Sequence, residues 1–150
     1  MSKMLGSELD EQAFEQINAR ESTVVVATVS PDGFPNTTPI HLIIAVDRGT
    51  FLFAMNKNHQ GLANIRREPK IMINLCEKKD LNISAKCNAS VYRERMDCND
   101  WMVVVKADIV EIKDDSTHSF TTGGIRYRCK TKKGEEFIRD VFDELNGKEV

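Results

Sequence analysis

The chain has 150 residues, of which 41% are hydrophobic and 29% are charged, and its formal net charge is −2. This length and balance predict a single folded domain and exclude an intrinsically disordered chain. Lys and Arg are spread along the sequence, which argues against nucleic acid as a partner. No apolar run is long enough to span a membrane, and the N-terminal segment lacks the apolar stretch of a signal peptide. We therefore expect a cytoplasmic protein.

A helix followed by three strands is predicted for the N-terminal part of the chain. Apolar residues with helical spacing begin after Ser7 and Asp10 and end at about Arg20. β-Branched residues, separated by turn signals such as Pro31-Asp32-Gly33, then indicate an antiparallel meander. Its strands are expected at residues 23–30, 35–46 and 50–54.

The rest of the chain predicts further strands and two helices. A short helix is expected from His59 until Pro69 stops it, because the residue before a proline avoids the helical region. The last helix is predicted over Glu135–Leu145, where one face is apolar. Apolar patterns indicate strands at residues 70–75, 81–91 and 101–112. About six antiparallel strands with a few peripheral α-helices indicate a mainly β fold, and closure into a β-barrel would remove its exposed edges.

The order of elements in Thr23–Leu75 resembles the FMN-binding split barrel of the pyridoxamine 5'-phosphate oxidase superfamily. It is also similar to the small FMN-binding proteins that use a minimal version of this fold. The resemblance covers residues 22–76 well and the rest loosely. It implies a single FMN-binding split-barrel domain over residues 1–150. It also implies a flavin-dependent oxidoreductase in which hydride is transferred through N5 of the flavin.

Two other interpretations of the same barrel stay open. The first is a non-catalytic module that binds flavin, haem or a deazaflavin for storage, sensing or electron transfer. The second is a structural protein in which the barrel persists but the cofactor has been lost. The colour of the purified protein would separate much of this choice.

In the resembling family, the strand at residues 36–41 lies along the flavin ring. Amide and hydroxyl side chains suit that place because they donate and accept hydrogen bonds without bringing a charge into the pocket. Family enzymes often carry a basic residue on this strand near the phosphate. The alternative is an ordinary polar segment that faces water after a turn. The resemblance assigns cofactor contact to Asn36, Thr37, Thr38, Pro39 and, as the basic candidate, His41.

A second polar cluster precedes the short helix. A helix N-terminus presents N–H groups and a positive dipole end, which suits a phosphate. By alignment with the family, His59 takes the opening position, whereas Gln60 and Gly61 replace the usual basic or hydroxyl pair. Three alternatives follow: Lys57 and the backbone amides hold the phosphate, another segment supplies the charge, or flavin binding is weak. A solvated helix start is the structural alternative. The predicted cofactor-binding residues are Met55, Asn56, Lys57, Asn58, His59 and Gln60.

Arg126 and Arg128 are the best remaining source of the missing charge. They follow Gly123-Gly124, where two glycines let backbone amides turn toward an anion. A planar guanidinium can bind two phosphate oxygens. In a dimer this segment could reach the site of the second chain. A flexible surface loop is the alternative interpretation.

A homodimer is expected, because apolar surface is predicted at Phe51, Phe53 and residues 103–105. The lone Trp101 is expected in the core or in a dimer interface. No residue stands out as a catalytic acid or base, which fits hydride transfer to or from a flavin. The four cysteines lack the spacing of a metal clip, so no metal site is predicted.

Overall fold

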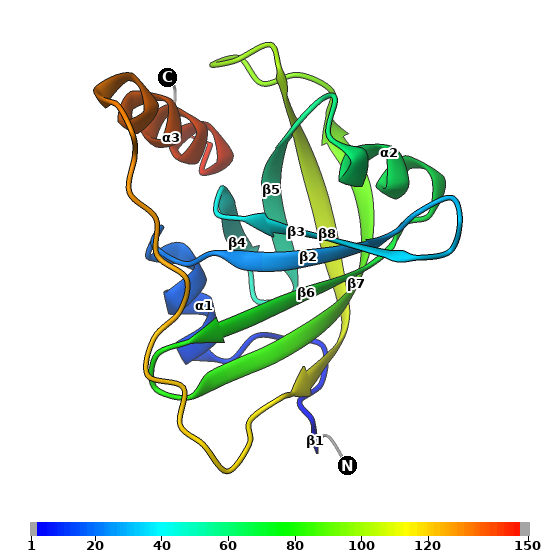
Figure 1. Cartoon of the computed structure of the whole chain (residues 1–150), viewed down its shortest axis with the longest axis vertical. Coiled ribbons are helices and arrows are strands. Elements are labelled where there is room, and N and C mark those ends of the chain that lie inside the picture. Colours follow the sequence, from blue (N-terminus) through cyan, green and yellow to red (C-terminus); the bar gives the residue numbers. More distant parts are fainter. Residues whose placement is uncertain (1–2, 148–150) are drawn as a thin grey trace.

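A computed structural model describes residues 3–147 of the chain. It consists of one antiparallel sheet of eight strands with three helices packed around it (Figure 1). None of the helices in this described range has the length and apolarity that crossing a membrane would require. The elements are β1 (Lys3–Met4), α1 (Glu11–Asn18), β2 (Val24–Val29), β3 (Pro35–Ile40), β4 (Ile43–Asp47), β5 (Thr50–Asn56), α2 (Gln60–Arg67), β6 (Lys70–Glu77), β7 (Leu81–Arg93), β8 (Met102–Asp114) and α3 (Lys132–Leu145).

The strand order is β3-β2-β6-β7-β8-β5-β4, with β1 paired to β8. β3 and β4 are consecutive in the chain but lie at opposite ends of this path, so the short link between them joins the two edges of the sheet. That connection gives the split barrel and confirms the mainly β fold class. The single strand predicted over residues 35–46 is therefore wrong. It breaks at His41 and Leu42, because β3 pairs with β2 whereas β4 pairs with β5.

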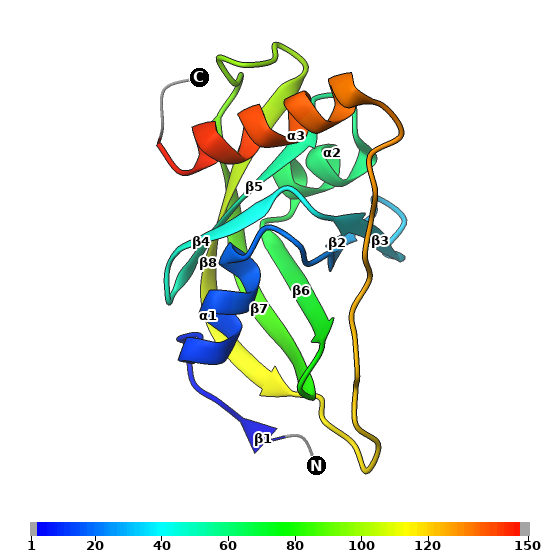
Figure 2. The same cartoon turned by 90° about the vertical axis from the view of Figure 1, so that its left-hand side faces the viewer.

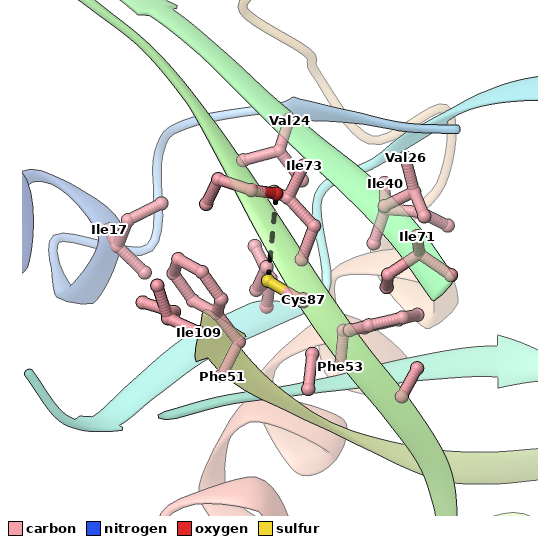
Figure 3. Packing of buried hydrophobic residues seen from close by; sticks show 14 of the residues in the cluster. Ile17, Val24, Val26, Ile40, Phe51, Phe53, Ile71, Ile73, Cys87 and Ile109 are labelled. Carbon is pink, nitrogen blue, oxygen red and sulfur yellow. Dashed lines mark hydrogen bonds between the residues drawn. The ribbon is translucent and has the colours of Figure 1, made fainter. Parts of the chain in front are cut away.

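The barrel interior is filled by aliphatic and aromatic side chains from seven of its strands, β2 to β8. Figure 3 shows Phe51 and Phe53 of β5 facing Ile71 and Ile73 of β6 across this core. Phe51 is 2% exposed and Phe53 is fully buried. The prediction of an apolar dimer surface at Phe51, Phe53 and residues 103–105 is therefore wrong, because these side chains lie in the core. β-Strand alternation turns both phenylalanines inward, whereas Leu52, which lies between them in β5, faces another layer of side chains.

That other layer is α3, which covers the outer face of β5 and β8. Leu42, Ala54 and Val104 form a second apolar cluster with Val141 and Phe142 of this helix. β8 is consequently buried on both faces near its start, which explains why residues 102–105 are apolar without alternation. The sequence does not reveal where α3 packs, so the apolar residues on this second face resemble exposed surface in the sequence pattern.

The helix starts differ slightly from the predicted ones. Asp10 is the N-cap of α1, and its carboxylate accepts a hydrogen bond from the Ala13 amide at 2.8 Å. α3 begins at Lys132, with Thr131 as its N-cap. Residues 115–131, called the strap below, connect β8 to α3 without helix or strand. Figures 1 and 2 show the strap running along the outside of the barrel to reach α3.

Candidate functional site

The polar cluster before α2 mostly builds its own turn and helix cap. The Asn56 side chain accepts a hydrogen bond from the Asn58 amide at 2.9 Å. His59 is the N-cap of α2, and its Nδ1 accepts from the Gly61 amide at 2.9 Å. Gln60 donates its side-chain amide to Asn64 at 3.0 Å. One of the first-turn N–H groups that a phosphate would need is therefore already bonded to the protein.

The structure gives a physical reason for the glycine that follows Gln60. A Cβ atom on Gly61 would lie 2.9 Å from Cε of Met55 and 3.1 Å from Nδ1 of His59. Met55 itself is buried in the barrel core, with 2% of its surface exposed. The basic side chain that the resembling family carries near this place would have to displace the Met55 methyl group. The helix start is thus packed for a glycine.

Lys57 is the remaining cation of this cluster, and it contacts an aromatic ring. Its Nζ lies 3.9 Å from the centroid of the Trp101 ring, a cation–π arrangement. The backbone reinforces the pair, since the Lys57 amide donates to the Trp101 carbonyl at 2.8 Å. Trp101 was expected in the core or in a dimer interface, and its 54% exposure excludes the core. Its position in a turn just before β8 leaves one ring face for Lys57.

The register of β3 divides the first predicted cluster between two faces. Asn36 and Thr38 are half-buried, whereas Thr37 and Pro39 are exposed. Asn36 contacts Thr28 at 3.4 Å, and the buried Asn64 of α2 donates to the same hydroxyl at 3.0 Å. Asn36 therefore contacts the Thr28 hydroxyl that holds α2 on the barrel. Thr37 is left on the outer face of the sheet.

His41 lies in the link between β3 and β4, beneath the strap. Its ring stacks on Tyr127 with centroids 4.2 Å apart, and the Tyr127 hydroxyl donates to the Arg20 carbonyl at 3.3 Å. Burial lowers the pKa of His41 below its ordinary value, so the neutral imidazole is favoured. Burial likewise raises the pKa of Tyr127. Tyr127 therefore uses one face of its ring to stack on a protein side chain.

Arg126 does not reach α2 within one protomer. Its guanidinium donates to both carboxylate oxygens of Glu77, at 2.8 and 2.9 Å, and Glu77 has no exposed surface. Glu77 ends β6, whose first residue, Lys70, follows α2. Eight strand residues separate these points by roughly 25 Å. Figure 1 likewise places the strap and α2 on opposite sides of the barrel. Arg128 is exposed on the same strap.

A groove that the sequence did not reveal lies on the outer face of β2, β3, β6, β7 and β8. Its volume is about 470 Å³, which is in the usual range for a small-molecule site. The floor is mostly apolar and the polar atoms come from few side chains. The residues that line it include Ala27, Val29, Met72, Lys70, Lys86, Asn88 and Val110.

Strand pairing shows how this groove meets the first predicted cluster. Thr37 pairs with Ala27, Ala27 with Met72, Met72 with Lys86, and Lys86 with Glu111. Paired residues point to the same face, so these five form one row across the outside of the barrel. Thr37 is therefore the sequence-predicted residue that stands at the end of this row.

A β-bulge shapes the far side of the groove. Lys86 pairs with Glu111 and Cys87 with Ile109, which leaves Val110 of β8 as the extra residue. The side chain of Val110 is 52% exposed and lines the groove. The bulge thus adds an apolar side chain to the groove. No alternation pattern in the sequence could have predicted it.

One of the four cysteines, Cys87, lines the groove and is buried. All four are free, and burial raises the pKa of the Cys87 thiol to about 12, so it stays protonated at neutral pH. Within residues 3–147, His, Cys, Asp and Glu side chains form no group of three or more that could hold a metal ion.

Comparison with known proteins now identifies the class to which this barrel belongs. The model of the pyridoxamine 5'-phosphate oxidase family matches residues 9–126, more than half of the chain. The chain therefore belongs to the pyridoxamine 5'-phosphate oxidase family, and the resemblance inferred from residues 22–76 is confirmed. An uncharacterized protein of Methanocaldococcus jannaschii is 32% identical over 83 residues, which span 53% of this chain and 56% of that protein. The match thus covers about half the length of that relative.

Solved structures share the fold at low sequence identity. A candidate pyridoxamine 5'-phosphate oxidase from Lactobacillus delbrueckii has a TM-score of 0.62 and 22% identity, covering 75% of this chain and 98% of that one. An FMN-binding protein from Syntrophomonas wolfei has a TM-score of 0.60 and 16% identity, covering 73% and 87%. An F420 reductase has a TM-score of 0.59 and 14% identity, covering 71% and 100%. These similarities establish the split-barrel fold.

Proposed function

We propose that this protein binds FMN and acts as a flavin-dependent oxidoreductase. The observation that carries the proposal is the apolar groove of about 470 Å³ on the outer face of a barrel of this family. The FMN-binding protein of Syntrophomonas wolfei supports the choice of cofactor through its shared fold. When bound, FMN would supply hydride transfer at N5 of its ring, which requires no acid or base from the protein.

The residues of the groove fit a flavin ring. Ala27, Met72 and Val110 give an apolar floor against which a planar heteroaromatic ring can be buried. Thr37 and Asn88 border this floor with groups that donate and accept hydrogen bonds.

A second candidate is a non-catalytic or deazaflavin-binding role for the same groove. The F420 reductase with a similar fold favours a deazaflavin as the alternative ligand. Haem binding and loss of the cofactor are the remaining interpretations of the barrel. These interpretations differ in which ligand the protein binds.

The test is to purify the protein, record its absorption spectrum and titrate it with FMN, riboflavin, the deazaflavin F420 and haem. We expect bound FMN, identified by chromatography of the released cofactor, and its reduction by a nicotinamide or other donor. Recovery of FAD alone would contradict the choice of FMN. A preference for F420 selects the second candidate, and a preference for haem selects the haem-binding interpretation. A colourless protein that binds none of these ligands would contradict the proposal.

We also propose a cytoplasmic homodimer. The apolar surface available for a symmetric contact is not the predicted one but includes Phe34, 72% exposed, and Phe120, 84% exposed. Light scattering at micromolar concentration should give twice the chain mass. The Phe34→Ser/Phe120→Ser variant should shift the mass toward the monomer, and a wild-type monomer would contradict the proposal.

A further inference from the structure

We propose that Lys70 and Lys86 hold the anionic end of the ligand in the outer groove. This inference rests on the proposed function and states which cations take the place of the basic pair missing at the start of α2. Both lysines line the groove, and both are exposed. The ligand class is a planar heteroaromatic molecule that carries a phosphate.

The start of α2 is poorly equipped to bind a phosphate. The Gly61 amide is already bonded to His59, and Gly61 leaves no space for a basic side chain beside Met55. Lys57 is the one cation of that cluster, and it lies on the Trp101 ring. A doubly charged group needs more compensation than this.

Three arginines that could have supplied the missing charge already contact other groups of the protein. Arg66 makes a bidentate ion pair with Glu94, at 2.9 and 2.6 Å. Arg67 donates to the Val29 carbonyl, which ends β2. Arg126 is bound to Glu77 at the far end of β6. These guanidinium groups already have protein partners, and for Arg66 and Arg126 the partner is a carboxylate bound at two points.

Lys70 and Lys86 lie close to each other on one face of the sheet. Lys70 pairs with Asn88 and Lys86 pairs with Met72, so the lysines are diagonal neighbours on the same face of β6 and β7. Diagonal neighbours in a sheet have Cα atoms roughly 7–8 Å apart, which flexible lysine side chains can span to reach one phosphate group. Their ammonium groups border an apolar floor formed by Met72 and Ala27. A ligand with a flat apolar ring and a charged tail matches this distribution.

One of the two lysines contacts a neighbouring carboxylate, that of Glu111. Within residues 3–147, Lys70 makes no ion pair, whereas Lys86 lies 3.3 Å from Glu111 across the strand pair. That pair is exposed to solvent, so it is weak and can be exchanged for a ligand phosphate. Glu111 should therefore compete with the ligand for Lys86. This competition gives a substitution that is expected to strengthen binding.

The experiment titrates the full-length chain with FMN and with riboflavin, which lacks the phosphate, and follows flavin fluorescence. The Lys70→Ala/Lys86→Ala variant should bind FMN at least tenfold and up to a hundredfold more weakly, with riboflavin affinity nearly unchanged. Glu111→Gln should strengthen FMN binding a few-fold without affecting riboflavin. Lys132→Ala/Lys133→Ala, exposed on α3, removes the same charge away from the groove and should change neither ligand.

The possible outcomes separate this inference from the proposed function. If FMN and riboflavin lose affinity equally, or if FMN affinity changes no more than in the α3 control, the lysines do not hold the phosphate and the inference is wrong. A double variant that becomes monomeric and loses both ligands would also overturn it, by making the groove an interface between copies. A wild-type chain that binds no flavin would overturn the proposed function itself, and this inference with it.

Discussion

Arg126 and Glu77 form a two-point ion pair in which the carboxylate has no exposed surface and the guanidinium side chain is 40% exposed. Ser22 and Gln16 also donate to this carboxylate, at 2.8 and 3.1 Å. The strap packs closely there, because a Cβ atom on Gly124 would lie 2.5 Å from a Glu77 oxygen. The pair therefore fastens the strap to the end of β6.

Arg126→Ala should lower the free energy of unfolding by about 1–3 kcal/mol, because it leaves a buried carboxylate without its counter-charge. The effect stays below that of a fully buried pair, since Arg126 is partly exposed and Ser22 and Gln16 remain as donors. Urea denaturation measures it. Arg128→Ala, two residues further along the strap, should change stability by less than about 0.5 kcal/mol. Equal losses in the two variants would contradict a specific role for Arg126.

The same carboxylate should make stability depend on pH. Burial alone would raise the pKa of Glu77, but hydrogen bonds from Arg126, Ser22 and the Lys78 amide outweigh it and hold the pKa below the ordinary value of 4.5. A carboxyl with a lowered folded-state pKa stabilises the fold above its unfolded pKa, and this contribution disappears as pH falls through the folded-state pKa. The stability lost by Glu77→Gln should thus be largest at neutral pH and should shrink below about pH 4.5. Glu136→Gln, which makes the same substitution on the exposed surface of α3, is the matched control.

His59 should matter for stability through its cap, whatever its part in ligand binding. His59→Ala removes the acceptor of the Gly61 amide and should cost about 1 kcal/mol, whereas His59→Asn supplies another capping side chain and should recover most of it. Thermal unfolding compares the three proteins. FMN titration adds the second readout. If His59 also contacts the phosphate, His59→Asn will weaken FMN binding and leave riboflavin unchanged despite its restored stability.

Local features of the fold could be predicted from the sequence because neighbouring residues determine them. The turn at residues 31–33, the start of α2 at His59 and the alternation in β6 each depend on a few adjacent side chains. The family resemblance could be recognised for the same reason, since it rests on the order of such elements.

The remaining features depend on contacts between distant segments. The break at His41 and Leu42 follows from which strands β3 and β4 pair with, and nothing in the local pattern shows those partners. Arg126 finds a carboxylate 49 positions away, and the Val110 bulge depends on the register of β7 against β8. The candidate groove is assembled from five strands and a bulge. Its lysines therefore look like ordinary surface residues in the sequence.

The last prediction concerns the stack of His41 on Tyr127. Burial holds the pKa of His41 below 6.5, and Tyr127 supplies much of the ring contact from the strap side. Tyr127→Ala should expose the imidazole and raise its pKa toward 6.5, whereas Tyr127→Phe keeps the ring and should leave the pKa low. NMR titration of the three histidines measures this shift.

The sign of the matching stability effect follows from linkage. A histidine with a lowered folded-state pKa binds its proton more readily in the unfolded chain, so folding loses stability as pH falls through 6.5. Tyr127→Ala should flatten this pH dependence while lowering stability at every pH through the lost packing. Tyr92→Ala, which truncates the other tyrosine at a site 58% exposed, should leave the His41 titration unchanged. An unaltered His41 pKa in Tyr127→Ala would show that the link between β3 and β4 buries the ring without the strap.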